Sequence, residues 1–385
     1  MVNFNFYAPT EIEFGKDAEL KVGGFVKKYG KTVLLHFGKG HIKKTGLYDR
    51  ILNQLSDEGI SVVELGGVKA NPDIELVREG IALCRDHKVD FILAVGGGSV
   101  IDSAKAIALG VPYEGDVWDF FYNGKTPLEV LPLGAVLTIP AAGSEMSKFS
   151  VITNGKYKIG YANDLMRLKF SILNPELTYS LSPWQTAAGV VDIMAHVMER
   201  YFTEETHVDF SDGMCEGLLH SMIKNGPKVL SEPDNYDTRA EVMWAGCIAH
   251  NGLLGMGRIE DWASHRIQMP LSALYDITHG AGLAIIFPAW IKYVSQLKPQ
   301  PFIKFFTRVF NVPYDFDNPE SVIKTGLELM ENFYKSLGMP TRLKDLDIDD
   351  SRFDELAGLV TEKGPTGFLV KLDRDAVQEI YKLAL

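Results

Sequence analysis

The chain has 385 residues, of which 46% are hydrophobic and 23% charged, a balance typical of a folded globular protein. Its formal net charge of -11 would repel phosphate backbones and anionic bilayers, so we expect neither nucleic acid nor a membrane as a partner. Three dispersed cysteines without a CxxC pair argue against a disulfide framework and against a thiolate zinc site.

The first 180 residues alternate between strand and helix patterns. We expect strands at 31–37, 61–67, 89–98 and 131–140, with helices at 46–59, 71–88 and 99–110. This alternation predicts a parallel sheet that is covered on both faces.

After about residue 180 the strand signals fade. Helical patterns follow at 181–202, 211–230, 238–255, 321–338 and 373–385, and the joint lies near 174–183. We therefore expect an α/β domain over residues 1–179 and an all-α domain over residues 180–385. The N-terminus lacks a basic stretch followed by an apolar one, and no apolar run reaches the ~18 residues of a membrane span, so we expect a cytoplasmic protein.

A glycine-rich turn stands between an apolar strand and a helix in AVGGGSVIDSAK, residues 94–105. Glycines let a backbone approach a ligand closely, and the amides of a helix N-terminus bind a pyrophosphate. The spacing is not the GxGxxG of the usual dinucleotide fingerprint, and a plain strand-to-helix turn gives the same pattern.

The end of an earlier strand, HFGKGHIKKTG at 36–46, lacks the acid that would bind the ribose 2′-hydroxyl of NAD. It offers Gly38 and Lys39 instead, followed by Lys43 and Lys44. A basic residue at this place suits a 2′-phosphate, so the sequence favours NADP(H) over NAD(H). A solvated lysine cluster is the competing interpretation.

An acid and an imidazole share one face of the helix VVDIMAHVMER at 190–200, because Asp192 and His196 are four residues apart. A buried salt-bridged pair would look the same. The apolar segment 259–288 adds His265 and His279, however. Three imidazoles and one carboxylate suit Fe2+, Zn2+ or a similar divalent ion.

In combination, these motifs resemble the iron-containing (group III) alcohol dehydrogenases, most closely the NADP-dependent butanol dehydrogenases among them. IEFGKDAEL (12–20), KANPDIELVREGI (69–81) and the segment 174–202 also resemble family segments, so the likeness covers essentially the whole chain. The resemblance implies a Rossmann-like N-terminal domain that binds the dinucleotide and a helical C-terminal domain that binds the metal, in a dehydroquinate synthase-like architecture. It also implies a homodimer that acts on small alcohols and aldehydes.

The resemblance also assigns roles to residues. Asp192, His196, His265 and His279 would be the metal ligands and would act in catalysis through the metal, which would be Fe2+ or Zn2+. The residues that would contact NADP(H) are Gly38, Lys39, Asn71, Gly97, Gly98, Ser99, Asp102, Thr138, Ser147, Lys158 and Leu177. Among them, Gly97 to Ser99 would bind the pyrophosphate, and Gly38 and Lys39 would face the 2′-phosphate.

One position departs from the family pattern. Close relatives usually carry a histidine four residues after the one that matches His265, whereas this chain has Met269 followed by Pro270. Methionine cannot relay a proton, which puts in doubt any mechanism that needs this histidine.

The activity that the resemblance implies is hydride transfer between the nicotinamide and a short aliphatic aldehyde or primary alcohol such as butanol, while the metal polarises the substrate oxygen. A glycerol dehydrogenase or a dehydroquinate synthase-like lyase would share the glycine turn and the metal. A metallohydrolase would not need the dinucleotide loop. A metal- or nucleotide-binding protein without turnover is a further alternative, because of Met269.

Overall fold

The computed structural model describes all residues, 1–385, and the chain forms two compact units. The α/β unit contains residues 7–181 and 234–251, and the helical unit contains residues 1–6, 182–233 and 252–385. The predicted division of the chain between residues 179 and 180 stays a prediction. In the structure, residues 1–6 belong to the helical unit, and residues 180–181 and 234–251 belong to the α/β unit.

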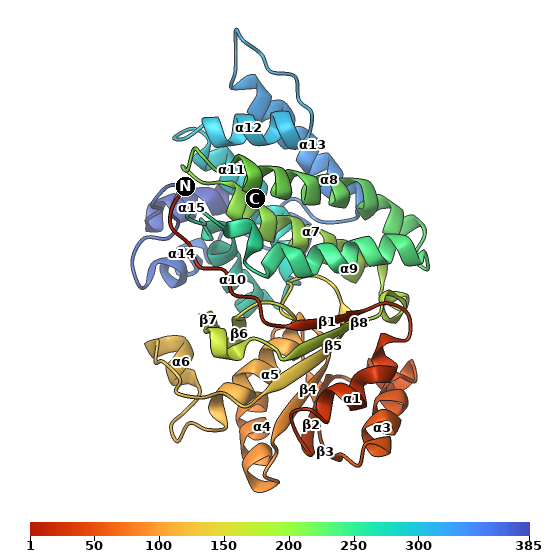
Figure 1. Cartoon of the computed structure of the whole chain (residues 1–385). Helices are drawn as coiled ribbons and strands as arrows, with labels where there is room; N and C mark the ends of the chain where they lie inside the picture. Colours follow the sequence, from red (N-terminus) through yellow and green to blue (C-terminus); the bar gives the residue numbers. More distant parts are fainter. The chain divides into compact units, whose positions relative to one another are not determined.

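A six-stranded sheet organises the α/β unit (Figure 1). Its strand order is β1-β8-β5-β4-β2-β3, and every neighbouring pair is parallel, so the predicted parallel sheet is confirmed. The strands are β1 (Glu11–Phe14), β2 (Thr32–Gly38), β3 (Ser61–Val68), β4 (Phe91–Gly97), β5 (Leu133–Ile139) and β8 (Phe170–Leu173).

Alternate residues of the central strands face opposite layers of helices, which is why these strands read as continuous apolar runs. Val33 and Leu35 of β2 belong to one core with α1 and α3, whereas Leu34 between them belongs to the other core, with α4 and α5. The covering helices are α1 (Val22–Val26), α3 (Leu47–Asp57), α4 (Ile74–Asp86) and α5 (Gly98–Gly110). Figure 1 shows α1 and α3 on one side of the sheet and α4 and α5 on the other.

The remaining elements of this unit include two short helices, one longer helix and one hairpin. The antiparallel hairpin turns at Gly155, which has a positive φ of 58°. The elements are α2 (His41–Lys44), α6 (Trp118–Asn123), β6 (Phe149–Asn154), β7 (Tyr157–Ala162) and α9 (Tyr236–His250).

The helical unit contains the other long helices, as the periodicity after residue 180 predicts. They are α7 (Pro183–Tyr201), α8 (Asp209–Ser231), α10 (Ala263–Tyr275), α11 (His279–Val294), α12 (Gln300–Val309), α13 (Ser321–Ser336), α14 (Phe353–Thr361) and α15 (Arg374–Leu383). None of the chain's helices combines the length and the apolar character that crossing a bilayer requires.

His36 on β2 makes the stability of the α/β unit depend on pH. Its buried ring is 2.8 Å from the Leu65 carbonyl oxygen and 2.8 Å from Ser103 Oγ, and burial lowers its pKa to about 4. The His36 ring therefore takes up a proton near pH 6.5 in the unfolded chain, but only near pH 4 in the folded chain. The free energy of unfolding consequently falls as the pH drops through this window. We expect a loss of about 2 kcal/mol between pH 7.5 and pH 5 from this residue.

Urea unfolding of the wild type and of His36→Gln at these two pH values measures this loss. The glutamine variant does not titrate, so its pH dependence should be smaller than that of the wild type by the stated amount. Equal pH dependence in the two proteins would contradict the assignment to His36.

Candidate functional site

Helix α7 carries the first two predicted metal ligands inside the helical unit. It begins with a capping box between Ser182 and Gln185 and with Pro183 in its first turn, all of which favour a helix start. Nearly every side chain after this first turn is buried, and Asp192 and His196 are only 4% and 5% exposed. His196 Nδ1 lies 2.8 Å from the Asp192 carbonyl oxygen and 3.0 Å from Asp192 Oδ1.

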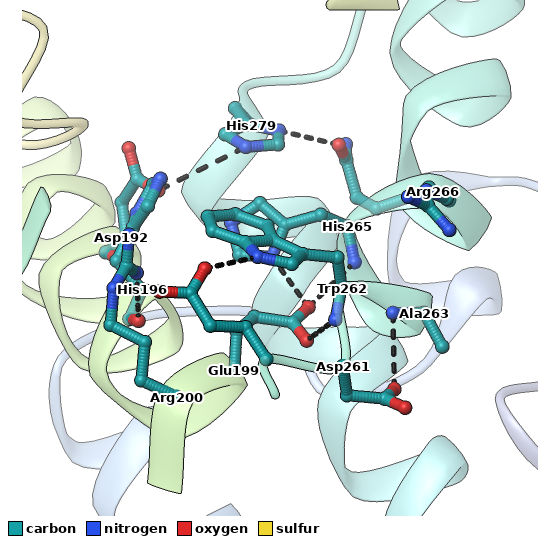
Figure 2. Close-up of polar contacts among 12 residues, drawn as sticks. Asp192, His196, Glu199, Arg200, Asp261, Trp262, Ala263, His265, Arg266 and His279 are labelled. Carbon is teal, nitrogen blue, oxygen red and sulfur yellow. Dashed lines mark hydrogen bonds and ion pairs between the residues drawn. The ribbon is translucent and has the colours of Figure 1, made fainter. Parts of the chain in front are cut away.

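The other two predicted ligands come from the next pair of helices. His265 lies in the first turn of α10, and His279 is the first residue of α11. Ligand atoms of Asp192, His265 and His279 all lie within 4.8 Å of one another, although more than 70 residues separate the first from the second in the chain. Figure 2 shows these side chains converging from the three helices.

His196 lies beside this group of three. Its ring centroid is 4.6 Å from that of His265, and the two rings meet edge to face. The structure thus gathers all four predicted ligands in one place, with three of them forming the tightest set. Their role as metal ligands stays a prediction.

Hydrogen bonds of the three rings fit metal coordination. Nδ1 of His196 faces the Asp192 carbonyl oxygen, Nδ1 of His265 faces Glu199 Oε1 at 2.7 Å, and Nδ1 of His279 faces Gln268 Oε1. A neutral imidazole that donates from Nδ1 has its lone pair on Nε2, the tautomer that these contacts assign. Metal-binding histidines show this pattern, with the second ring nitrogen donating to an oxygen.

Buried acids around the rings add negative charge that a cation would offset. Burial raises the pKa of Glu199 to about 7. Burial, and then the charge of Glu199, raise the pKa of Asp261 to about 6. Together with Asp192, these carboxylates make a cluster that is costly to ionise without a positive partner. The nitrogen and oxygen donors suit Fe2+ or Zn2+, so the residues present fit the metal that the sequence predicts.

The glycine turn of the α/β unit joins β4 directly to α5. A Cβ on Gly97 would lie 2.9 Å from the Ile139 side chain, and one on Gly96 would lie 2.5 Å from Val100, so close packing requires both glycines. Gly98 and Ser99 open α5, whose 13 residues present first-turn amides at this point. First-turn amides of this kind can bind a pyrophosphate, and the pyrophosphate site predicted here stays a prediction.

Several predicted cofactor residues are engaged within the protein. Lys158 Nζ donates to Asn71 Oδ1 at 2.9 Å, which pairs two predicted residues from distant parts of the sequence. The Asp102 carboxylate accepts from Ser144 Oγ at 2.6 Å and from the Val151 amide at 3.0 Å, and burial raises its pKa. Through these two hydrogen bonds Asp102 fixes the segment 144–151.

Lys105 is a residue of this region that the sequence analysis did not single out. Its side chain is fully buried, and Nζ donates to the carbonyl oxygens of Ser144, Ser147 and Phe149 at 2.7, 2.9 and 2.8 Å. It thus fixes the segment that carries the predicted Ser147. The available signal was its place as the only cation of the apolar helix α5, three residues after Asp102.

A cavity of about 150 Å³ lies near the carboxyl ends of β2 and β5, and two predicted cofactor residues, Thr138 and Leu177, line it. Its other lining residues are His41, Ile42, Thr45, Leu47, Arg50, Glu176, Tyr179 and Ser180. Gly38 ends β2, and the exposed Lys39 follows it, two residues before His41. This is the place in a parallel sheet where ligands usually bind.

Two family models together match nearly the whole chain. Residues 9–175 match the family model described as iron-containing alcohol dehydrogenase, and residues 186–385 match the model of the C-terminal part of the same family. The chain is 42% identical to the probable NADH-dependent butanol dehydrogenase 1 of Bacillus subtilis and 37% identical to the NADPH-dependent aldehyde reductase YqhD of Escherichia coli, each over 100% of both chains.

A solved structure shows the same fold. The crystal structure of NADH-dependent butanol dehydrogenase A from Thermotoga maritima superposes with a TM-score of 0.95 at 39% identity and covers 99% of this chain and 98% of that one. The chain belongs to the iron-containing alcohol dehydrogenase family, so the resemblance found in its sequence is confirmed. It is an oxidoreductase of the alcohol dehydrogenase class.

Proposed function

We propose that the protein is a metal-dependent, NADP(H)-using aldehyde reductase and alcohol dehydrogenase that interconverts short aliphatic aldehydes and primary alcohols such as butanal and butanol. The observation that carries the proposal is the group of Asp192, His265 and His279, with ligand atoms within 4.8 Å of one another. Names of the similar proteins, which include butanol dehydrogenases and an aldehyde reductase, support the substrate class.

Asp192, His196, His265 and His279 would hold one Fe2+ or Zn2+ ion in the helical unit. When bound, the ion supplies a positive charge that polarises the substrate oxygen, and the nicotinamide supplies the hydride. In the α/β unit, Gly97, Gly98 and Ser99 would bind the pyrophosphate through the first turn of α5.

The remaining predicted cofactor residues would contact other parts of NADP(H). Thr138 and Leu177 would contact the cofactor from the cavity that they line, with Asn71, Asp102, Ser147 and Lys158 nearer the nicotinamide end. Asp102 would act there by holding the backbone of 144–151, as its hydrogen bonds indicate.

The preference for NADP(H) rests on the end of β2. No carboxylate follows this strand directly, and the exposed Lys39 stands where a 2′-phosphate would be bound. Similar proteins carry names of both kinds, NADH-dependent and NADPH-dependent, so the residues of this chain have to decide the preference. We further propose a cytoplasmic homodimer with no partner other than its small-molecule substrates.

The decisive experiment follows NADPH absorbance with butanal, before and after a chelator and after Fe2+ or Zn2+ is added back, with NADH in parallel. We expect oxidation that chelation abolishes and metal restores, with NADPH the better donor. Omitting butanal is the control for oxidation by free metal. Turnover that survives complete metal removal would refute the metal-dependent mechanism.

A second candidate function is metal and nucleotide binding without turnover. Met269 is half-buried on α10, one turn after His265, and its side chain cannot relay a proton. The same assay separates the candidates, because a binding protein would take up metal and NADPH but oxidise no NADPH with any aldehyde.

A further inference from the structure

Glu199 lies one turn after His196 on α7 and is 1% exposed. Its Oε1 accepts from His265 Nδ1 at 2.7 Å and from the His265 amide at 3.0 Å, and its Oε2 accepts from the Trp262 amide at 2.5 Å. Its own carbonyl oxygen accepts from the Asp261 amide at 3.0 Å. One residue of α7 therefore binds several groups at the start of α10, while Asp261 Oδ2 accepts from the Ala263 amide at 3.1 Å, as Figure 2 shows.

The start of α10 needs this outside support. Trp262 is its N-cap residue, has a positive φ of 64° and provides no side-chain cap. A left-handed conformation is costly for a bulky residue and persists only where its surroundings hold it. Glu199 caps the helix in its place, because a carboxylate that accepts first-turn amides also opposes the positive end of the helix.

Glu199 is a carboxylate acceptor of a histidine Nδ1 that is not itself one of the proposed metal ligands. The Nδ1 of His196 faces a backbone carbonyl, and that of His279 faces the neutral amide of Gln268. The Nδ1 of His196 also lies 3.0 Å from Asp192 Oδ1, but Asp192 is itself a proposed ligand, whereas Glu199 is not. A carboxylate fixes the tautomer and makes the opposite ring nitrogen a stronger ligand.

We propose that Glu199 is a positioning residue of the metal centre. It fixes the place of His265 through the N-terminus of α10 and directs His265 Nε2 as a ligand through the hydrogen bond to Nδ1. The inference rests on the proposed function in taking His265 as a ligand, and it assigns to Glu199 no contact with the ion.

The variant Glu199→Gln keeps the size of the side chain but replaces one acceptor oxygen with a donor, so it cannot serve all three N–H groups. We expect the metal-free variant to bind Zn2+ about 10- to 100-fold more weakly than the wild type, measured by competition with a chromogenic chelator. Far-UV circular dichroism should be unchanged, and so should NADPH binding.

Glu331→Gln is the matched control. Glu331 is also a buried acid of the helical unit, but it pairs with Lys292 at 2.7 Å and with Arg342 at 3.2 Å. Its replacement should lower stability without changing the Zn2+ affinity. A folded Glu199→Gln variant with wild-type affinity, or an equal loss of affinity in Glu331→Gln, would overturn the proposal.

A second measurement uses the wild type, in case Glu199→Gln does not fold. Nitrogen-15 spectra of histidine-labelled protein, with the His265 signal assigned through His265→Gln, report which ring nitrogen carries the proton. We expect a proton on Nδ1 of His265 both before and after Zn2+ is added, and a proton on Nε2 would overturn the proposal. If the wild type binds no Zn2+ or Fe2+, the metal centre itself is wrong and this inference falls with it; wild-type binding with an unaffected variant refutes the inference alone.

Discussion

Asp192→Ala should release the metal and lower kcat/KM for butanal by at least about 10³-fold. Asp192 is the only carboxylate in the tight group, and its ligand atom lies within 4.8 Å of those of His265 and His279. Without it the remaining donors are neutral imidazoles, which leave the charge of a dication uncompensated in a buried place. A loss of about 4 kcal/mol of transition-state stabilisation corresponds to this rate factor.

Metal content by elemental analysis and steady-state kinetics of the purified variant are the measurements. Asp212→Asn is the matched control, since Asp212 is an equally buried acid of the helical unit that pairs with Arg258 at 3.0 Å and with Lys304. It should lower stability and leave metal content per folded protein unchanged. Wild-type metal content and activity in Asp192→Ala would mean that the group is a structural ion pair, the competing interpretation of the Asp-x-x-x-His spacing.

The parallel sheet was predictable because its central strands are long and buried on both faces. Residues 31–37, 89–98 and 131–140 each overlap one of these central strands, and residues 61–67 overlap the partly exposed edge strand β3. The edge strand β1 and the strand β8 have four residues each, too few to show a period, and pairing with each other and with β5 supplies what their own sequences lack. The hairpin β6–β7 did carry a local signal, the Asn154-Gly155 pair between two alternating runs.

The candidate site, like the sheet, could be predicted from the sequence only in part. Spacing along one helix placed Asp192 beside His196, and residue type alone suggested His265 and His279 as partners. Spacing cannot show that three helices meet, so the distance between these groups had to come from the structure. Glu199 and Lys105 were missed because each acts through contacts with distant backbone, and a lone acid or lysine in a helix gives no sign of them.

Compact units are harder still to predict from a sequence. Helix α9 has the same helical pattern as its neighbours in the chain, yet it belongs to the unit of the sheet. Cys247 on α9 donates to Glu145 Oε1 at 3.0 Å, and Phe149 meets the ring of His250 with centroids 5.1 Å apart. Contacts of this kind decide where a helix packs, and its periodicity shows only that one face is apolar.

Lys39→Glu should raise the KM for NADPH by about 10- to 100-fold and leave the KM for NADH within about twofold. A hydrogen-bonded contact between opposite charges contributes about 1.5–3 kcal/mol, and each 1.4 kcal/mol is a factor of ten. Lys39 is exposed directly after β2, so its replacement should leave the fold intact. NADH has no 2′-phosphate, so its KM should change little. Any change should lower that KM, because a glutamate at this position can accept from the ribose 2′-hydroxyl of NADH.

Lys44→Glu separates a contact from a general field effect. Lys44 is also exposed and ends the short helix α2, which begins two residues after Lys39, and its replacement changes the net charge by the same amount. Screening at physiological salt weakens an exposed charge beyond about 8 Å, so this variant should change the KM for NADPH far less. If both variants weaken NADPH binding equally, the lysines act as a solvated cluster. If Lys39→Glu affects NADPH and NADH alike, the 2′-phosphate is not bound at the end of β2, and the preference for NADP(H) loses its structural basis.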